Sequence, residues 1–257
     1  MNLEIFLIIL VLGALIGLAL GALGGGGSIL TVPILVYLLH LDTHVAVTTS
    51  LVIVGINALV GTLLHYRAGH VRIKESLLFG IYGIFAAYIG ARVSSLLPGP
   101  VLLLLFGLLM LIIASMMLRP KKQMQRSYQS WWVTLLGGLG VGFLTGFLGV
   151  GGGFLVVPAL VLFLGMDMPD AVGSSLVVIA LNSASGILGH LSGGPQPWPL
   201  IGLFSLAGVV GLFIGTRITK IIPSKRLSQI FALFVFILGI VILAVNIPGT
   251  LHYLKMI

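Results

Sequence analysis

The sequence contains no cysteine and has few charged residues of either sign. The absence of cysteine excludes disulfide bonds, thiolate metal ligands and a thiol nucleophile. Only 7% of the 257 residues are charged and 59% are hydrophobic, whereas a soluble domain averages about 25% charged residues. This composition excludes a soluble domain and a disordered chain, and it predicts an integral membrane protein.

Carboxylates are scarcer still, and their positions limit the mechanism. The five acidic residues lie at the edges of apolar segments or between them: Glu4, Asp42, Glu75, Asp167 and Asp170. No carboxylate is predicted at mid-membrane depth, so a buried acidic proton relay has no candidate. The sequence also lacks a Walker motif, a GxSxG elbow and an HExxH pattern. We therefore expect no enzymatic activity and no cofactor.

The net charge of +8 comes from 13 lysine and arginine residues in short stretches between apolar runs. Because they form no basic face, we expect them to set membrane topology and not to bind nucleic acid. The apolar run at the N-terminus has no basic residue before it and no evident cleavage site, which predicts a first helix and not a signal peptide.

The chain divides into ten apolar segments, of which eight are long enough to span a bilayer. The second and seventh have only about 12 residues, a length typical of half-membrane or re-entrant helices. The segments lie near residues 4–23, 28–39, 45–64, 77–97, 101–118, 131–148, 154–165, 171–190, 200–222 and 227–247.

An internal repeat with an offset of 125 residues organises these segments. Residues 21–33 match 146–158, residues 48–57 match 173–182, and residues 89–98 match 214–223. Aligned without a gap, residues 17–98 and 142–223 are identical at about 30 positions, where this composition alone gives roughly ten. The sequence thus predicts a first repeat over 1–118, a basic connector over 119–130 and a second repeat over 131–257.

Each repeat holds five segments, an odd number, so the second copy enters the membrane from the opposite side. If each short segment instead forms a V with the helix before it, three crossings per repeat remain and the inversion survives. The basic loops fall on one side in either arrangement, which predicts a cytoplasmic connector and both termini on the outer side. The fold class is therefore all-α integral membrane with two inverted-topology repeats.

Two glycine-rich turns are the first candidate site. Glycine allows left-handed backbone conformations, and each turn opens a short helix whose first N–H groups lack partners and carry partial positive charge. Broken helices of this kind bind anions in inverted-repeat transporters, although glycines also serve close helix packing. The candidate residues are Gly24, Gly25, Gly26, Gly27 and Ser28 in the first copy, and Gly149, Gly151, Gly152 and Gly153 in the second.

Polar residues in the third and eighth segments also recur in both repeats. Ser50 and Asn57 lie seven residues apart on one helix face, and Ser175 and Asn182 match them, with Ser174 adjacent. They are candidates to line a cavity for substrate. The alternative is that they form hydrogen bonds between helices.

Matched arginine and histidine residues complete the candidates. Arg92 and Arg217 have the bidentate geometry that suits an oxyanion, but snorkelling to the interface explains them as well. His65 and His190 could carry protons or form interfacial hydrogen bonds. A metal site at His40, Asp42 and His44 is not expected, since only the aspartate recurs in the second copy, and these three residues are interpreted as loop or capping residues.

The doubled glycine motif ending in Val-Pro, at 21–33 and 146–158, together with the Ser and Asn segments and the Gly-x-Arg motifs at 90–92 and 215–217, resembles the TauE/SafE family of sulfite exporters. The resemblance spans nearly the whole chain. It implies a prokaryotic cytoplasmic-membrane transporter of small sulfur-containing anions, such as sulfite, thiosulfate, sulfoacetate or other organosulfonates.

Residues and resemblance together predict a secondary transporter that works by alternating access, with the anion bound at the two glycine turns. Its partners would be the lipid bilayer, the anion and a coupling ion, either proton or sodium. A passive anion channel and a non-transport membrane enzyme or subunit are the alternatives. The sequence predicts neither the direction of transport nor the oligomeric state.

Overall fold

The computed structural model describes residues 3–25, 27–118, 131–149, 152–190, 195–218 and 223–254, and over these residues it contains helices and no strand. The elements in chain order are α1 (Leu3–Leu23), α2 (Ser28–Pro33), a π-helix η1 (Ile34–Leu38), α3 (Thr43–Arg67), α4 (Ile73–Ser94), α5 (Gly99–Leu118), α6 (Trp131–Leu148), α7 (Gly153–Phe163), α8 (Met168–Gly189), α9 (Trp198–Ile218) and α10 (Ser224–Leu254).

Seven helices in the described part of the chain are long and apolar enough to cross a membrane: α1, α3, α4, α5, α6, α8 and α9. The helical run Ser28–Leu38 is shorter, and so is the apolar stretch Val235–Ile247 inside α10. Large apolar side chains such as Phe85 and Leu206 point outward, each 69% exposed. Apolar groups outside and long apolar helices confirm the predicted all-helical membrane class.

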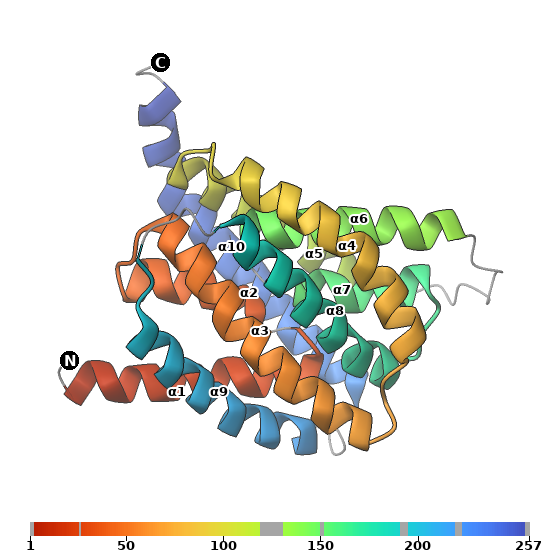
Figure 1. Cartoon of the computed structure of the whole chain (residues 1–257). Coiled ribbons are helices and arrows are strands. Elements are labelled where there is room, and N and C mark those ends of the chain that lie inside the picture. The colour runs from red at the N-terminus through yellow and green to blue at the C-terminus, as the bar shows by residue number, and fades with distance from the viewer. Residues whose placement is uncertain are drawn as a thin grey trace.

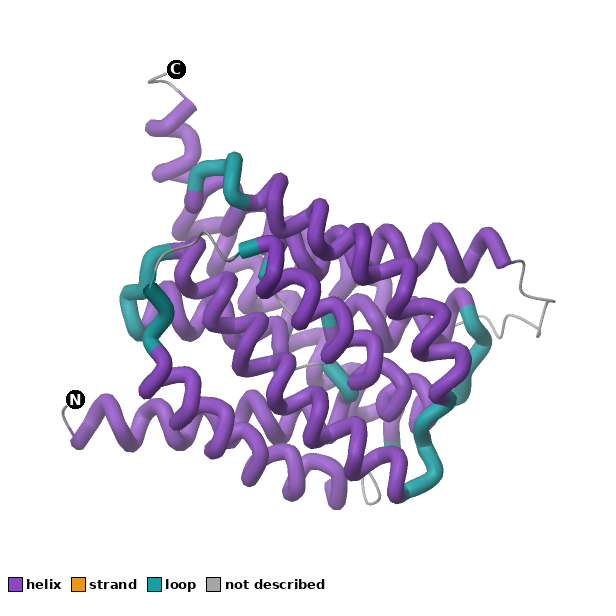
Figure 2. The backbone as a smooth tube through the Cα atoms, in the orientation of Figure 1, coloured by secondary structure: helices purple, strands orange, loops and turns teal. Residues whose placement is uncertain are grey.

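Glycine backbone conformation explains where α1 and α6 end. Gly24 and Gly149 directly follow these helices with φ angles of +70° and +67°, a region that side-chain-bearing residues rarely adopt. Beyond each turn the chain enters a short helix. In Figure 1 the loop after η1 lies at the end of the molecule where α1 begins, and α7 likewise returns toward the end where α6 begins. Each long helix and its short successor therefore form a hairpin, with loop pieces inside the bundle (Figure 2).

The two prolines of the repeated motif have different effects on the short helices. Pro33 ends α2, and the next five residues form the π-helix η1. Pro158 lies inside α7, which continues to Phe163. A proline removes one helical hydrogen bond, so a local change of helix type is one way for the backbone to accommodate it.

Close helix packing recurs in pairs at an offset of 125 residues. A Cβ atom added to Gly17 of α1 would overlap Gly208 of α9, and one added to Gly142 of α6 would overlap Gly83 of α4. Because 17 matches 142 and 208 matches 83, the same contact is made twice with the halves of the chain exchanged. The contact of Gly215 with α1 and that of Gly90 with α6 repeat the pattern. Small residues permit these close backbone approaches in membranes.

Helices α3 and α8 pack against each other, with Gly55 of α3 lying against Ser183 of α8. Their buried faces carry most of the polar side chains of the interior, including Thr48, Thr49 and Ser50 on α3 and Ser174, Ser175, Asn182 and Ser183 on α8. Helices α5 and α10 pack mainly against each other, through Gly107 and Gly239. The polar interior thus belongs to the α3–α8 pair and to the two hairpins beside it.

Candidate functional site

The two glycine turns meet inside the bundle. A Cβ atom added to Gly25 would lie 2.0 Å from the carbonyl carbon of Gly153, and one added to Gly153 would lie 2.2 Å from the Cα of Gly25. The turn before α2 therefore packs backbone against backbone on the first residue of α7. Two more predicted site residues, Gly26 and Gly151, lie outside the described residues.

Every described residue of the two turns is buried, including Ser28, whose exposed fraction is 0%. The Ser28 hydroxyl donates to the Gly25 carbonyl over 2.7 Å, and the amides of Leu155 and Val156 donate to Gly152 O over 2.9 and 2.8 Å. Gly152 has a φ of +71° where its counterpart Gly27 has −69°. The matched turns are thus similar in place and different in detail.

The first turns of α8 cover the glycine turn that follows α1. The Ser175 hydroxyl donates to the Gly24 carbonyl over 2.5 Å, and a Cβ on Gly24 would overlap the backbone of Val172. The matching turn is covered by α3, since a Cβ on Gly149 would overlap Val47. However, the hydroxyl of Ser50, the counterpart of Ser175, is buried without a hydrogen-bond partner.

Asn57 and Asn182 occupy equivalent notches beside glycines. The Asn57 amide lies against Gly208 of α9, and the Asn182 amide lies against Gly83 of α4. Asn57 donates to Ile53 O over 3.0 Å and its Oδ1 has no partner, while neither amide atom of Asn182 has one. Unpartnered buried amides are costly, so these groups are available to water or to a ligand.

Ser174 does not face the glycine turns. Its hydroxyl accepts a hydrogen bond of 2.9 Å from the Arg72 amide in the loop before α4. Its counterpart Thr49 instead contacts the segment before α9, donating to the side-chain oxygen Gln196 Oε1 over 3.1 Å. These two hydroxyls attach loops to α8 and α3.

The matched histidines make different contacts. His65 Nε2 lies 3.3 Å from Gly21 O, near the end of α1, whereas His190 Nδ1 lies 3.0 Å from Gly186 O in its own helix. His190 follows the last residue of α8, and burial lowers the pKa of its imidazole, with the hydrogen bond to Gly186 opposing this shift. Asp42 caps α3 by accepting from the His44 amide over 2.9 Å, which is the capping role expected for it.

Both arginines are exposed near the ends of their helices, α4 and α9. Arg92 Nε and Nη2 donate to the Tyr88 hydroxyl over 3.3 and 3.2 Å, and the guanidinium lies 5.5 Å from the centre of that ring. The Arg92 side chain is thus exposed and contacts a tyrosine one turn earlier in its own helix. This geometry favours an interfacial role, with the charge at the surface.

Arg92→Gln is therefore expected to leave transport within about twofold of the unsubstituted chain, because an exposed cation paired with a tyrosine contributes little. Initial rates of anion uptake into vesicles check this result. A loss of tenfold or more would instead assign Arg92 to the anion path.

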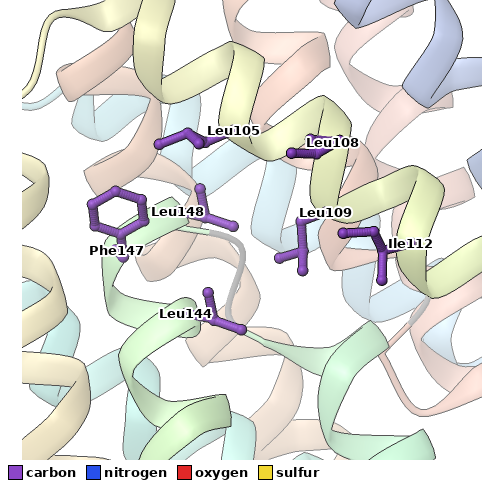
Figure 3. Close-up of a pocket in the computed structure, with 7 residues that line it drawn as sticks. All are labelled: Leu105, Leu108, Leu109, Ile112, Leu144, Phe147 and Leu148. Atoms are coloured by element: carbon purple, nitrogen blue, oxygen red, sulfur yellow. The ribbon is translucent and has the colours of Figure 1, made fainter.

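An apolar groove between α5 and α6 has a volume of about 180 Å³ (Figure 3). It is lined by Leu105, Leu108, Leu109, Ile112, Leu144, Phe147 and Leu148. All of its lining side chains are apolar, so they offer an anion neither a hydrogen bond nor a charge. The groove is therefore not a candidate anion site.

Sequence reasoning missed the glycines that receive the two asparagines. Gly83 and Gly208 occupy equivalent positions of the two repeats. Gly83 lies opposite Asn182, and Gly208 lies opposite Asn57. The sequence did contain a signal for this contact. Both the glycine and the asparagine occur in each repeat at the same offset of 125 residues, which is typical of a packing site that both repeats share. Sequence reasoning also missed the contacts of the first turns of α8, which join residues far apart in the chain.

Comparison with known proteins decides the family. The family model described as "Sulfite exporter TauE/SafE" matches residues 9–242. The chain belongs to the TauE/SafE family.

TauE/SafE relatives cover nearly the full length of the chain. A "Probable membrane transporter protein" of Xylella fastidiosa (strain Temecula1) is 34% identical over 252 residues, which cover 95% of this chain and 97% of the relative. "Probable membrane transporter protein YunE" of Bacillus subtilis is 31% identical, covering 92% and 95%, and YdhB of the same organism is 27% identical, covering 92% and 99%. No solved structure matches the chain. As a member of this family the chain is a membrane transporter.

Proposed function

We propose that this TauE/SafE transporter carries small sulfur-containing anions, and that the anion binds where the two glycine turns meet. The observation that carries the proposal is the backbone contact between Gly25 and Gly153, which brings the beginnings of two short helices to one place inside the bundle. Helix beginnings carry partial positive charge and N–H donors, so two of them at one point favour an anion.

Buried polar side chains on α3 and α8 supply donors for an oxyanion. The Ser50 hydroxyl and the Asn182 amide are buried without partners, and the Ser175 hydroxyl contacts the first turn. Asn57 donates to Ile53 O, and its unpartnered Oδ1 is an acceptor. A sulfite or sulfonate group has three oxygens, each of which accepts hydrogen bonds from hydroxyl or amide donors. A cation would instead require carboxylates, and the acidic residues lie at helix ends and in loops. The name of the matched family, sulfite exporter, agrees with this chemistry.

The two halves of the chain are proposed to be inverted repeats that rock against each other. The paired glycine contacts, made twice with the halves exchanged, support a two-fold relation between them. Alternating access through inverted repeats places the substrate at their interface. In this proposal the basic loops are cytoplasmic, the termini are on the outer side, and the membrane is the prokaryotic cytoplasmic membrane.

Vesicles that contain only this chain test the function. Uptake of labelled sulfite or sulfoacetate should exceed that of protein-free vesicles at least several-fold, and it should respond to an imposed pH or sodium gradient. Uptake that ignores both gradients would support a passive channel. No uptake of any sulfur oxyanion would overturn autonomous transport of these anions.

A further inference from the structure

The loop between α3 and α4 is fastened to the beginning of α8 by an ionic clamp, which we define as His70, Arg72 and Asp170. Arg72 Nε lies 2.9 Å from Asp170 Oδ2, and His70 Nδ1 lies 3.4 Å from Asp170 Oδ1. The same loop donates its Arg72 amide to Ser174 Oγ. Figure 2 shows this loop and the loop before α8 together at one end of the molecule.

The backbone fit at this clamp is tight. A Cβ atom added to Gly173 would lie 2.0 Å from His70 O and 3.1 Å from the Cβ of His65. The loop carbonyl therefore sits in a notch that only glycine provides. Charge pairing, backbone capping and this notch together hold the loop against α8.

The opposite face of the same short segment covers the first glycine turn. Val172 packs on Gly24, and the Ser175 hydroxyl donates to Gly24 O. Residues 170–175 are thus held between the loop on one side and the glycine turn on the other. Movement of the beginning of α8 away from Gly24 would therefore uncover the turn on this side.

The matching position at the other end carries no charges. By the repeat offset, Asp170 corresponds to Val45 and Arg72 to Pro197, and Thr49 makes a neutral hydrogen bond to Gln196 there. The Ser50 hydroxyl, which corresponds to Ser175, has no partner. The two ends of the molecule are therefore closed by different chemistry.

We infer that Asp170, Arg72 and His70 form the gate that closes the glycine turns toward the end of the bundle carrying the 68–72 loop. This inference rests on the proposed function in that the glycine turns are the substrate site. The three residues act as positioning residues: they hold α8 on Gly24 and do not touch the substrate. Opening this gate breaks the ionic contacts and the Ser175 bond together.

Accessibility of one introduced cysteine tests the gate without any substrate. The chain has no cysteine, so Val172→Cys provides a single thiol beneath the clamp. A charged, membrane-impermeant thiol reagent is applied to each face of sealed membranes separately. Adding Asp170→Asn should raise the labelling rate about three- to tenfold from the face of the 68–72 loop only, since the pair is partly exposed and its coupling is modest. Glu75→Gln is the control, because Glu75 is an exposed carboxylate in the first turn of the adjacent helix α4.

Arg72→Gln breaks the same pair from the loop and serves if Asp170→Asn does not insert. The exchange of both charges, Arg72→Asp with Asp170→Arg, should return the labelling rate toward that of the chain with the clamp intact. Unchanged labelling in both single variants, equal acceleration from both faces, or the same acceleration in Glu75→Gln would overturn the gate. Because labelling needs no anion, a failed gate and a failed transport assay are separate results.

Discussion

Replacing Gly25 by alanine is expected to abolish transport, while alanine at Gly202 leaves it unchanged. The added methyl group at Gly25 would lie 2.0 Å from the Gly153 backbone, which cannot move aside as a flexible side chain can. A Cβ at Gly202, on the surface of α9, meets no atom within 4 Å. Overpacking in a close interface costs about 1–3 kcal/mol or more, and here it separates the two helix beginnings that form the proposed site.

The measurement is anion uptake in vesicles, with insertion and thermal unfolding of each variant followed alongside. We expect Gly25→Ala to insert but to lose at least about 100-fold in uptake rate, the equivalent of roughly 2.7 kcal/mol. Near-normal uptake by Gly25→Ala would mean that transport does not require the contact between the turns.

Asn182→Ala should weaken anion affinity about 10- to 150-fold with little loss of thermal stability. Both amide atoms of Asn182 are buried without a partner, so their removal costs the resting protein no hydrogen bond. A hydrogen bond to a charged ligand contributes about 1.5–3 kcal/mol, which sets the expected loss of affinity. Equilibrium titration of the purified variant with sulfite measures it.

Ser185→Ala is the matched control on the same helix. Its hydroxyl donates to Ile84 O over 2.5 Å, so its removal takes away a partnered hydrogen bond of the fold. This control should lose about 1 kcal/mol of stability and keep its affinity. If Asn182→Ala keeps its affinity as well, the asparagine serves helix packing and not the anion.

Much of the architecture could be predicted because it depends on local sequence patterns. The lengths of the apolar segments predict the helices. The two glycine runs, which are separated by the repeat offset, predict two equivalent turns. The φ angles near +70° at Gly24 and Gly149 are conformations that glycine adopts at little cost, which is why the turns were recognisable. From the sequence, each short segment could either cross the membrane fully or form a V with the helix before it. The structure indicates a hairpin, because the chain returns toward the end where the preceding helix begins.

The use of individual polar groups could not be predicted, since it depends on contacts between distant parts of the chain. Ser174 and Ser175 are neighbours, yet Ser174 binds the 68–72 loop and Ser175 contacts the first glycine turn. In the sequence, Asp170 is one of several carboxylates at segment edges. Its contact with Arg72 joins residues 98 positions apart, and no local pattern predicts it. Likewise, Arg92 has the chemistry of an anion ligand but lies exposed on Tyr88.

The number of anions bound per chain tests the central claim most directly. Titration calorimetry of the purified chain with sulfite, and with sulfoacetate as a second probe, counts the sites. A single site built jointly by both turns should give one anion per chain, and binding should vanish in Gly25→Ala and in Gly153→Ala alike. Two anions per chain, or full affinity retained in either variant, would contradict it.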